Sequence, residues 1–502
     1  MKKKFLYLLL VIGVIQLNTS CKKSFLEVSP KGTVLESNYY QNADQAYAAL
    51  ISVYNPLGWE FCQGNYSSDL LTLNSASDEC WSGGGNSSDT PVVQVMNNYT
   101  VDATTGPQAG FWSKYYTGIY RANLVLQKID AGIPGLTDAV KTRYIAECKF
   151  LRAYYYFGLV RLFKNVPLFL TPIPMPEIYN VVQAKPEDVW AQVEKDLTDA
   201  IAGLPSVVPT TDNGRVTKGA ALALMGKAIL YQNNNARMAE AAGYFEQVNT
   251  SPNYGLLSDF ASIFSPDNKF NKESIFEIYH TEAGKAGDWG NLGSVLGNIY
   301  VEMIGPRSYT GPTYASGWSF DPIIPAFAAV MKTDPRYKYT VANIDSLCKA
   351  TGTTYVGGYL NSGYFIQKYA PLAKYKATVG TVELNFKNDY IEIRLADTYL
   401  MEAEALVRGG TTGTAHSAQY YLDAVRARVG LPSVPATLDN IYNERKFELA
   451  TEGHRWYDLV RTGKAATVLA FKGFTANKNE LLPIPLKDMN NTKLNQNPGY
   501  LK

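Results

Sequence analysis

Side chains that bind metals or form disulfide frameworks are scarce in this chain. Of its 502 residues, three are histidine and five are cysteine. His280, His416 and His454 lie far apart, and the cysteines show no CxxC or mixed Cys/His spacing. Both patterns argue against a metal centre built on His or Cys, so we predict no metal-binding residue and no cofactor, and the sequence leaves calcium binding open. Cys62 and Cys80 could form a disulfide in an oxidising compartment, and the sequence leaves this pairing open.

A strong net charge and the common catalytic motifs are also missing. The chain has 47 basic and 45 acidic residues, whereas nucleic-acid binding needs a strongly basic face. No GxSxG, P-loop or HExxH motif occurs. Gly83, Gly84 and Gly85 are expected to form a flexible turn rather than a phosphate cradle, because no GK[ST] follows them. Paired carboxylates for glycoside hydrolysis stay open, but we predict a protein that is not an enzyme and has no catalytic residue.

The N-terminus has the pattern of an export signal. Three lysines follow Met1, residues 5–17 are almost entirely apolar, and Cys21 comes directly after a small residue, Ser20. The apolar run is too short for a permanent membrane span of ~30 Å. A small residue before a cysteine is typical of a bacterial lipoprotein signal, so we predict that residues 1–20 are removed and that Cys21 is acylated. An ordinary secretory signal with Cys21 incidental is the alternative, since position 18 is Asn where such signals usually have Leu.

Helical periodicity dominates the rest of the chain. The segments predicted to be helical are 111–130, 136–163, 186–203, 215–231, 236–248, 389–410, 416–430 and 438–460. Within 389–410, Ile393, Ala396, Leu400, Ala403 and Val407 fall on one stripe. These segments form pairs with small residues at the expected crossings, which resembles degenerate tetratricopeptide repeats.

The sequence therefore predicts a mainly α fold, a degenerate tetratricopeptide-like scaffold with a loop-rich subdomain that faces the ligand. The scaffold is assigned to about 30–54, 111–250 and 389–465. Segments 55–110 and 251–388 are rich in Gly, Ser, Asn, Pro and aromatic residues and have little helical periodicity. Long irregular segments of this kind are usually functional. We expect residues 21–502 to form a single unit that ends in segment 466–502.

The helix predicted over 438–460 carries an acid, a base and an imidazole close together. Its opposite charges stand at i,i+3 spacing: Arg445 with Glu448, Glu452 with Arg455, Arg455 with Asp458, and Asp458 with Arg461. Such pairs stabilise a helix face modestly. We therefore predict a structural role for these residues, and a packing role for His454, rather than catalysis.

Several motifs in fixed order resemble one known family. They are ERKFELATEGHRWYDLVRTGK at 444–464, LLPIPLKDMNNTKLNQNPGY at 481–500, AECKFLRAYYYFGLVRLFKNVPLF at 146–169, YIEIRLADTYLMEAEAL at 390–406, FWSKYYTGIYRAN at 111–123, and GRVTKGAALAL at 214–224 with DPRY at 334–337. Together, behind a lipoprotein signal, they are similar to the SusD/RagB family of outer-membrane lipoproteins of Bacteroidetes. The resemblance covers nearly the whole chain.

The resemblance implies a function and a partner. In that family the lipoprotein caps a TonB-dependent outer-membrane β-barrel of the SusC type, captures an oligosaccharide and delivers it for import. We therefore expect a lipid-anchored protein of the outer membrane that faces the outside. A helical-repeat lipoprotein used only for protein contacts is the alternative, as is capture of peptides rather than glycans.

Aromatic residues in the irregular segments are the candidates for ligand binding. An indole or phenol ring stacks on the C–H face of a sugar, while polar side chains bond its hydroxyl groups. The candidates form two groups: Asn74, Asp78 and Trp81, and Trp289, Tyr300, Arg307, Tyr309, Tyr314 and Trp318. Among these Trp81 is the first choice, because Ser, Gly and Asn surround it. The remaining tryptophans are assigned to the core (Trp59, Trp112) or to helix interfaces (Trp190, Trp456).

Overall fold

The computed structural model describes residues 39–501, except 63–64, 67, 284–287, 290–294 and 411–414. The predicted signal and Cys21 lie outside these residues. Within the described part, no helix is both long enough and apolar enough to cross a membrane.

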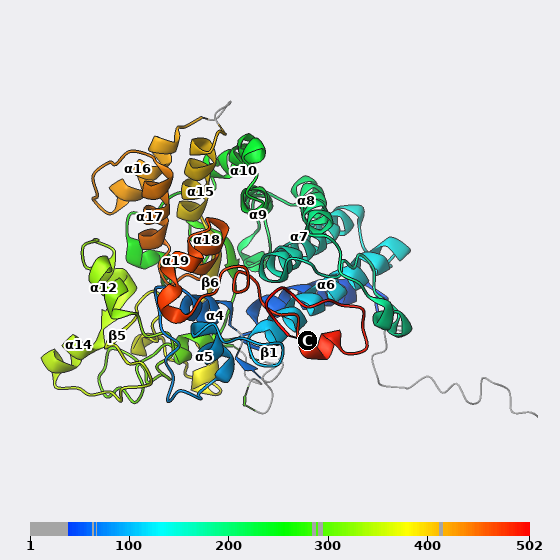
Figure 1. The fold of residues 1–502 in the computed structure, drawn as a ribbon. Coiled ribbons are helices and arrows are strands. Elements are labelled where there is room, and N and C mark those ends of the chain that lie inside the picture. Colours follow the sequence, from blue (N-terminus) through cyan, green and yellow to red (C-terminus); the bar gives the residue numbers. More distant parts are fainter. Residues whose placement is uncertain are drawn as a thin grey trace, which may run out of the picture.

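The long helices come from the segments predicted to be helical, except the first of them, which lies in the stretch 30–54 that is assigned to the scaffold. They are α3 (Ala43–Tyr54), α6 (Gln108–Ala131), α7 (Asp138–Phe163), α8 (Pro186–Gly203), α9 (Lys218–Tyr231), α10 (Met238–Asn249), α15 (Leu395–Val407), α16 (Ala418–Arg428) and α17 (Leu438–Glu448). Successive helices from α6 to α10 contact each other, and α10 then contacts α15 although about 150 residues separate them. Figure 1 shows this row of helices along the upper and right side of the molecule. The prediction of a mainly helical protein is confirmed.

Small residues let the helices approach closely, as the sequence predicts. A Cβ on Gly118 of α6 would lie 2.1 Å from the Tyr155 ring of α7, and a Cβ on Gly158 would lie 2.8 Å from the Tyr115 ring of α6. Each helix thus supplies a glycine under the other's tyrosine. Side-chain caps fix where helices begin: Oγ1 of Thr137 accepts a hydrogen bond from the backbone N–H of Val140 at the start of α7.

The segments predicted to be irregular contain short elements. In and beside 55–110 these are η2 (Asn55–Gly58), β1 (Phe61–Cys62), β2 (Asn65–Tyr66), α4 (Asp69–Ala76) and α5 (Pro91–Asn97). In 251–388 they are η6 (Phe260–Phe264), β3 (Ser274–Ile278), α11 (Ile299–Met303), α12 (Pro325–Met331), α13 (Tyr337–Thr340), β4 (Val341–Asn343), α14 (Ile344–Thr351), β5 (Tyr364–Ile366), η8 (Ala373–Tyr375) and η9 (Val382–Leu384). The others are η3 (Met175–Asn180), η4 (Thr210–Asp212), η5 (Asn235–Arg237), β6 (Tyr390–Arg394), α18 (Arg455–Arg461), α19 (Ala465–Val468), η10 (Ala470–Lys472) and α20 (Leu486–Met489).

The prediction of one helix over 389–410 is wrong at its start. Residues Tyr390–Arg394 form the strand β6, which pairs antiparallel with β3 and places Ile393 opposite Phe276. The sequence YIEIR alternates β-branched and polar residues, which suits a strand when a partner is available. Only after Arg394 does α15 begin, and its Val407 is 37% exposed instead of completing the buried stripe.

The predicted helix 438–460 is broken in the middle. α17 ends at Glu448 and α18 starts at Arg455, with Thr451 at φ 65° and Gly453 at φ 77° between them. Residues far away in the sequence hold this turn: Asn74 Oδ1 accepts from Gly453 N at 3.0 Å, and Glu79 Oε2 accepts from Thr451 N at 2.9 Å. Tertiary hydrogen bonds therefore override the helical periodicity.

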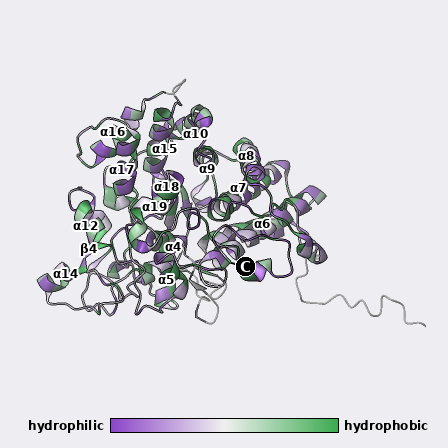
Figure 2. Cartoon of the chain, viewed as in Figure 1, coloured by the Kyte–Doolittle hydropathy of each residue, from purple (hydrophilic) through white to green (hydrophobic). Residues whose placement is uncertain are grey.

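One large apolar core extends through the helices and the segment 299–331. Helix α9 lies inside it, with every residue from Gly219 to Leu230 buried. Outer helices have a polar face: Figure 2 shows hydrophilic residues along α16 and α17. The core thus supports both the row of helices and the short elements beside it.

Candidate functional site

Two tryptophans of the second predicted group meet at the surface. Trp289 is 46% exposed, and its ring stacks on Trp318 with centroids 5.8 Å apart and planes at 30°. Trp318 is half-buried and packs against the main core. The pair, here called the Trp289–Trp318 platform, gives an apolar surface that the core supports from below.

The backbone around Trp318 is held firmly by the residues after α11. Trp318 N donates to Glu302 O at 3.1 Å, and Ser319 N donates to Gly305 O at 2.8 Å. A Cβ on Gly317 would lie 2.4 Å from the Cα of Gly305, so only glycine fits where the two backbones pass. The backbone that carries the Trp318 ring is therefore held in place before any ligand arrives.

The glycine run predicted to be a flexible turn is packed against this same segment. Gly83 has φ +67°, and a Cβ there would lie 2.2 Å from the carbonyl oxygen of Ser319. Gly84 N donates to Ser319 O and Gly84 O accepts from Tyr359 N, both at 2.8 Å. Both Gly83 and Gly84 are buried. The expectation of flexibility is wrong, because the missing side chains allow close packing rather than motion.

Charged side chains lie beside the platform. Nη2 of Arg307 donates to the carbonyl oxygen of Trp318 at 2.9 Å and lies 3.6 Å from Oδ2 of Asp89. The same Asp89 oxygen accepts from Gly85 N at 2.7 Å. Among the described residues, Arg307 Nε has no hydrogen-bond partner. Sequence reasoning named Arg307 but missed Asp89, whose signal was the polar run NSSD directly after the glycines.

This arrangement suits a ligand with an apolar face and a hydroxylated edge. The indole rings offer the stacking surface, and about a third of each of the Arg307 and Asp89 side chains is exposed beside them. A guanidinium donates and a carboxylate accepts, so together they can bond both functions of a hydroxyl group. A sugar ring has this combination of surfaces.

Two of the predicted ligand-binding residues are instead buried structural residues. Asn74 is 1% exposed and Tyr300 is 0% exposed. Asn74 Nδ2 donates to Tyr300 Oη at 2.9 Å and to Thr451 O at 3.0 Å, and Tyr300 Oη donates to Asp321 at 3.3 Å. These bonds join α4, α11 and the turn before α18. They leave no surface for a ligand, so these two predictions are corrected.

Asp78 contacts α18 and Trp81 contacts η10, and neither residue is part of the platform. Asp78 forms a bidentate pair with Arg455, at 2.7 and 2.9 Å. The Trp81 ring is half-buried, packs edge-on against Phe471 at 5.7 Å and lies 5.1 Å from the Lys472 ammonium. The first choice from the sequence therefore packs against η10, and its neighbours explain it without a ligand.

Tyr309 and Tyr314 belong to a small separate core. They are 7% and 9% exposed, pack edge-on at 5.8 Å, and share this core with apolar residues of β4, α14 and β5. Tyr314 Oη donates to Gln367 at 2.6 Å. Packing, not ligand contact, accounts for both residues.

The remaining assignments from the sequence concern four tryptophans and one cysteine pair, and the structure agrees with only some of them. Trp112 is 6% exposed in the core, and Trp456 is fully buried. Trp190 packs on Phe157 of α7, at a helix interface as predicted. Trp59 is only half-buried, so its assignment to the core is corrected. Cys80 is a free, buried cysteine, so it does not pair with Cys62.

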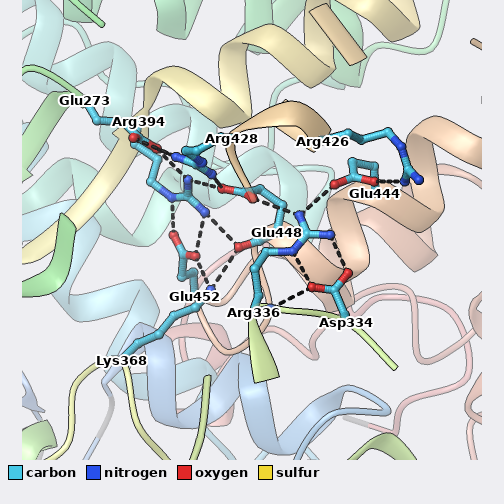
Figure 3. Close-up of polar contacts among 10 residues, drawn as sticks. All are labelled: Glu273, Asp334, Arg336, Lys368, Arg394, Arg426, Arg428, Glu444, Glu448 and Glu452. Atoms are coloured by element: carbon cyan, nitrogen blue, oxygen red, sulfur yellow. Dashed lines mark hydrogen bonds and ion pairs between the residues drawn. The ribbon is translucent and has the colours of Figure 1, made fainter. Parts of the chain in front are cut away.

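A dense network of buried charges lies where the helices meet the segment 251–388 (Figure 3). Its members are Glu273, Asp334, Arg336, Lys368, Arg394, Arg426, Arg428, Glu444, Glu448 and Glu452. Glu448 lies at the centre and bonds Arg394 at 2.6 Å, Arg336 at 2.9 Å, and Arg428. Glu452 bonds Arg394 twice, at 2.7 and 2.8 Å. We call these residues the Glu448 network.

The Glu448 network satisfies its own charges. Basic and acidic members are equal in number, and the side chains of Glu448 and Glu452 are completely shielded from solvent. Burial would raise the pKa of Glu448, but Arg428, Arg394 and Arg336 outweigh it and hold the pKa well below its usual value. A charged carboxylate without solvent or an open side cannot act on a ligand, so we assign the network to structure.

The predicted i,i+3 ion pairs are mostly wrong. Within the described residues, only Asp458 with Arg461 forms among the four. Arg445 instead bonds Asp397 at 2.7 Å and Asp458 at 2.8 Å, because the break before α18 folds that helix back. Burial lowers the pKa of His454 to about 4, which keeps the imidazole neutral. The structural role predicted for this region agrees with the geometry, although the pairing differs.

Across the described residues, no group of three or more His, Cys, Asp or Glu side chains could hold a metal ion.

Comparison with known proteins identifies the family to which the chain is similar. Residues 330–500 match the SusD family, and residues 24–230 match the family described as starch-binding and associating with the outer membrane. A solved structure of a laminarin-binding SusD-like protein is 43% identical, covers 92% of this chain and all of its own, and superposes with a TM-score of 0.86.

The chain belongs to the SusD family. Other relatives agree with this assignment along nearly the whole sequence. Surface glycan-binding protein A from Bacteroides thetaiotaomicron, solved in complex with laminarihexaose, is 29% identical over 91% of this chain and 99% of its own, with a TM-score of 0.84. SusD-like protein P25 of Formosa agariphila is 28% identical, and the match covers 94% of each chain. Like the SusD family as a whole, this chain is a binding protein and not an enzyme.

Proposed function

We propose that this SusD-family protein captures an oligosaccharide on the Trp289–Trp318 platform and passes it on without cleaving it. The observation that carries the proposal is the stacked tryptophan pair beside Arg307 and Asp89. Trp289 is exposed and Trp318 is half-buried, whereas the candidates Tyr300, Tyr309 and Tyr314 are buried in packing. The backbone hydrogen bonds of Trp318 and Ser319 hold one half of the pair in place, which limits the entropy lost when a ligand binds.

A β-glucan fragment is the ligand class that we propose. Two similar proteins carry the names of laminarin and laminarihexaose, at 43% and 29% identity over more than nine-tenths of this chain. The platform offers stacking for one or two sugar rings, and each aromatic contact contributes about 0.5–1.5 kcal/mol beyond buried area. Laminarihexaose is therefore the first probe to test.

The proposed cellular setting follows from the sequence and the family. Cys21 would carry the lipid that anchors the protein to the outer membrane, facing outward. A SusC-type TonB-dependent barrel would receive the oligosaccharide, with this protein as a hinged lid. A stable lid interface needs more than ~1,000 Å² of buried surface.

Calorimetric titration of the chain lacking residues 1–21 with laminarihexaose tests the binding site. We expect saturable binding that weakens in both Trp289→Ala and Trp318→Ala. Tyr179→Ala is the matched control, because Tyr179 is 58% exposed on η3 and is not part of the platform. Equal loss in all three variants, or no binding of any glycan in a screen, would favour a scaffold that makes only protein contacts.

The anchor and the partner need a separate test in cells. We expect Cys21→Ala to release the protein from the outer membrane and to abolish labelling by a fatty-acid analogue. Cys348→Ala is a control that leaves the predicted lipid site intact. Affinity purification of the native protein should recover a TonB-dependent barrel, and failure to recover one after mild solubilisation would contradict the lid mechanism.

A further inference from the structure

A second concavity lies between α3, η2 and the residues that follow β3. Its volume is about 290 Å³, and it includes Tyr47, Trp59, Tyr279, His280 and Leu296 but no residue of the Trp289–Trp318 platform. We propose that this concavity, here called the Tyr279 pocket, binds a pyranose ring of an oligosaccharide independently of the platform. The inference rests on the proposed function only for the class of ligand.

Exposed apolar side chains gather at this pocket. Tyr279 is 52% exposed, Leu296 47%, Tyr47 40% and Ile51 39%, and all four line the same concavity. Single exposed apolar residues are ordinary, but a cluster around a hollow marks a binding surface. The two phenol rings supply the flat faces on which the C–H side of a sugar packs.

Trp59 extends the aromatic wall and is held in place. Its Nε1 donates to Asn55 Oδ1 at 3.0 Å, and the Arg121 guanidinium lies 5.5 Å from the ring centroid. Asn55 also accepts from Arg121 at 3.1 Å. The indole therefore keeps one orientation without a ligand, which lowers the cost of binding.

His280 lines the pocket and has a buried hydrogen-bond acceptor without a partner among the described residues. The residue is 2% exposed. Its Nδ1 lies 3.2 Å from the carbonyl oxygen of Ile278, so Nδ1 must carry the proton. Its Nε2 is then an acceptor, and it has no hydrogen-bond partner among the described residues. A buried acceptor of this kind requires a donor, and a ligand hydroxyl supplies one.

The charged residues of the pocket favour a neutral ligand. Arg215 bonds Glu147 at 2.6 Å and Asp212 at 3.0 Å, so its charge is already balanced. Burial lowers the pKa of His280 to about 3, which keeps the ring uncharged and unable to attract an anion. An ionised carboxylate has no proton to give Nε2, whereas a sugar hydroxyl has one. The pocket therefore selects a polyol with an apolar face.

Histidine-selective nitrogen NMR makes a direct test, because the chain has only three histidines. With ¹⁵N-histidine label and added laminarihexaose, we expect the His280 Nε2 resonance to shift as it accepts a hydrogen bond. The shift should persist in Trp318→Ala and vanish in Tyr279→Ala. Tyr179→Ala, which changes another exposed tyrosine, should behave like the wild type.

A pair of glycine variants tests the pocket without removing an aromatic ring. A Cβ on Gly58 would lie 3.7 Å from His280 Nε2, an ordinary contact that keeps a hydroxyl away from this nitrogen. Gly243→Ala is the control, since a Cβ there meets no atom within 4 Å. We expect Gly58→Ala to abolish the His280 shift and the binding that remains in Trp318→Ala, with Gly243→Ala unchanged.

The outcomes separate this inference from the proposed function. Calorimetry should show two sites in the wild type, and one site in each of Trp318→Ala and Tyr279→Ala. If Trp318→Ala loses all binding, or if Tyr279→Ala and Gly58→Ala change nothing, the second site does not exist while the platform stands. If binding is lost in Tyr279→Ala but unaffected by Trp318→Ala, the platform assignment fails and the pocket stands. If the wild type binds no laminarihexaose, both proposals are contradicted.

Discussion

The Glu448 network and the Trp289–Trp318 platform have opposite relations to water. In the network, side chains of Arg336, Glu448 and Glu452 are completely shielded, and the carboxylates have cationic partners at 2.6–2.9 Å. On the platform, Trp289 is 46% exposed and about a third of the Arg307 side chain is exposed. Both regions are rich in groups that could bind a ligand, but only the platform presents such groups to solvent.

The buried charges of the network therefore have a structural role, whereas the exposed indole rings can contact a ligand. Desolvating an ion pair costs much of its Coulomb attraction, so the network contributes less to stability than its many bonds suggest. It fixes instead how α16 and α17 lie against the segment 251–388, because Glu273, Glu444 and Glu448 each bond at least two guanidinium groups. The platform depends on that arrangement indirectly, since its residues lie within the same segment.

Among these substitutions we expect the largest effect from Glu448→Gln in the Glu448 network. Loss of this charge leaves Arg394, Arg428 and Arg336 without their shared partner. We expect the free energy of unfolding to fall by about 3–5 kcal/mol, because an uncompensated buried charge is costly. Denaturant unfolding measures this. Glu240→Gln, which removes an acid on the exposed part of α10, should change the stability by less than about 0.5 kcal/mol.

Trp318→Ala is the converse change at the platform. We expect affinity for laminarihexaose to fall about 10- to 100-fold, since a large apolar contact of about 1.5–3 kcal/mol is lost. Calorimetric titration measures it, with residual binding at the Tyr279 pocket fitted separately. Affinity within twofold of the wild type would show that the platform does not contact the ligand.

Glu79→Gln tests whether a buried acid without a cationic partner lowers the stability as pH rises, unlike the paired acids of the Glu448 network. Burial raises the pKa of Glu79 to about 8, and its Oε1 has no hydrogen-bond partner among the described residues. Below about pH 4.5 Glu79 is protonated in both the folded and the unfolded state, so its burial carries no penalty for charge. As pH rises toward 8 the unfolded state releases this proton more readily than the folded state, so the free energy of unfolding falls. We expect Glu79→Gln to be more stable than the wild type by about 1–3 kcal/mol at pH 8, and the difference to disappear at pH 4.5. Thermal unfolding at both values checks this, and a gap that does not change with pH would contradict it.

Arg307→Lys is the smallest change. The lysine keeps the positive charge but loses the planar fork that bonds Trp318 O and faces Asp89. We expect a two- to fivefold loss of affinity for laminarihexaose, equivalent to about 0.5–1 kcal/mol, with unfolding unchanged. A larger loss of stability than of affinity would assign Arg307 to structure rather than to binding.

Much of the helical fold was predictable, because the spacing of apolar residues along the sequence indicates where helices form. The segments that became α6, α7 and α8 carry clear periodicity, and the glycines at the α6–α7 crossing were visible as small residues. Residues 390–394 were assigned to a helix because YIEIR precedes a helical stripe; only the partner strand β3 shows that they form β6. The same limit applies to the turn at Thr451 and Gly453, which Asn74 and Glu79 hold from far away in the chain.

The sequence predicted which types of residue form the candidate site, but not which of the named residues lie together at the surface. Nine residues were named, and the structure joins three of them, Trp289, Trp318 and Arg307, at one exposed surface. Asn74 and Tyr300 looked equally suitable but are buried in hydrogen bonds with each other. Exposure depends on which distant segments cover a side chain, and residue type alone does not carry that information.

Local sequence patterns were enough to determine the class of the protein, a mainly helical chain of the SusD family with no Cys/His metal spacing and none of the common catalytic motifs. Helical periodicity and family motifs are local properties, so they can be read along the chain. The tertiary structure alone decided which aromatic rings face solvent, which charges neutralise one another, and that His280 keeps an acceptor without a partner among the described residues. These outcomes depend on contacts between segments up to several hundred residues apart, such as Asn74 with Gly453, and a list of residues does not specify such contacts.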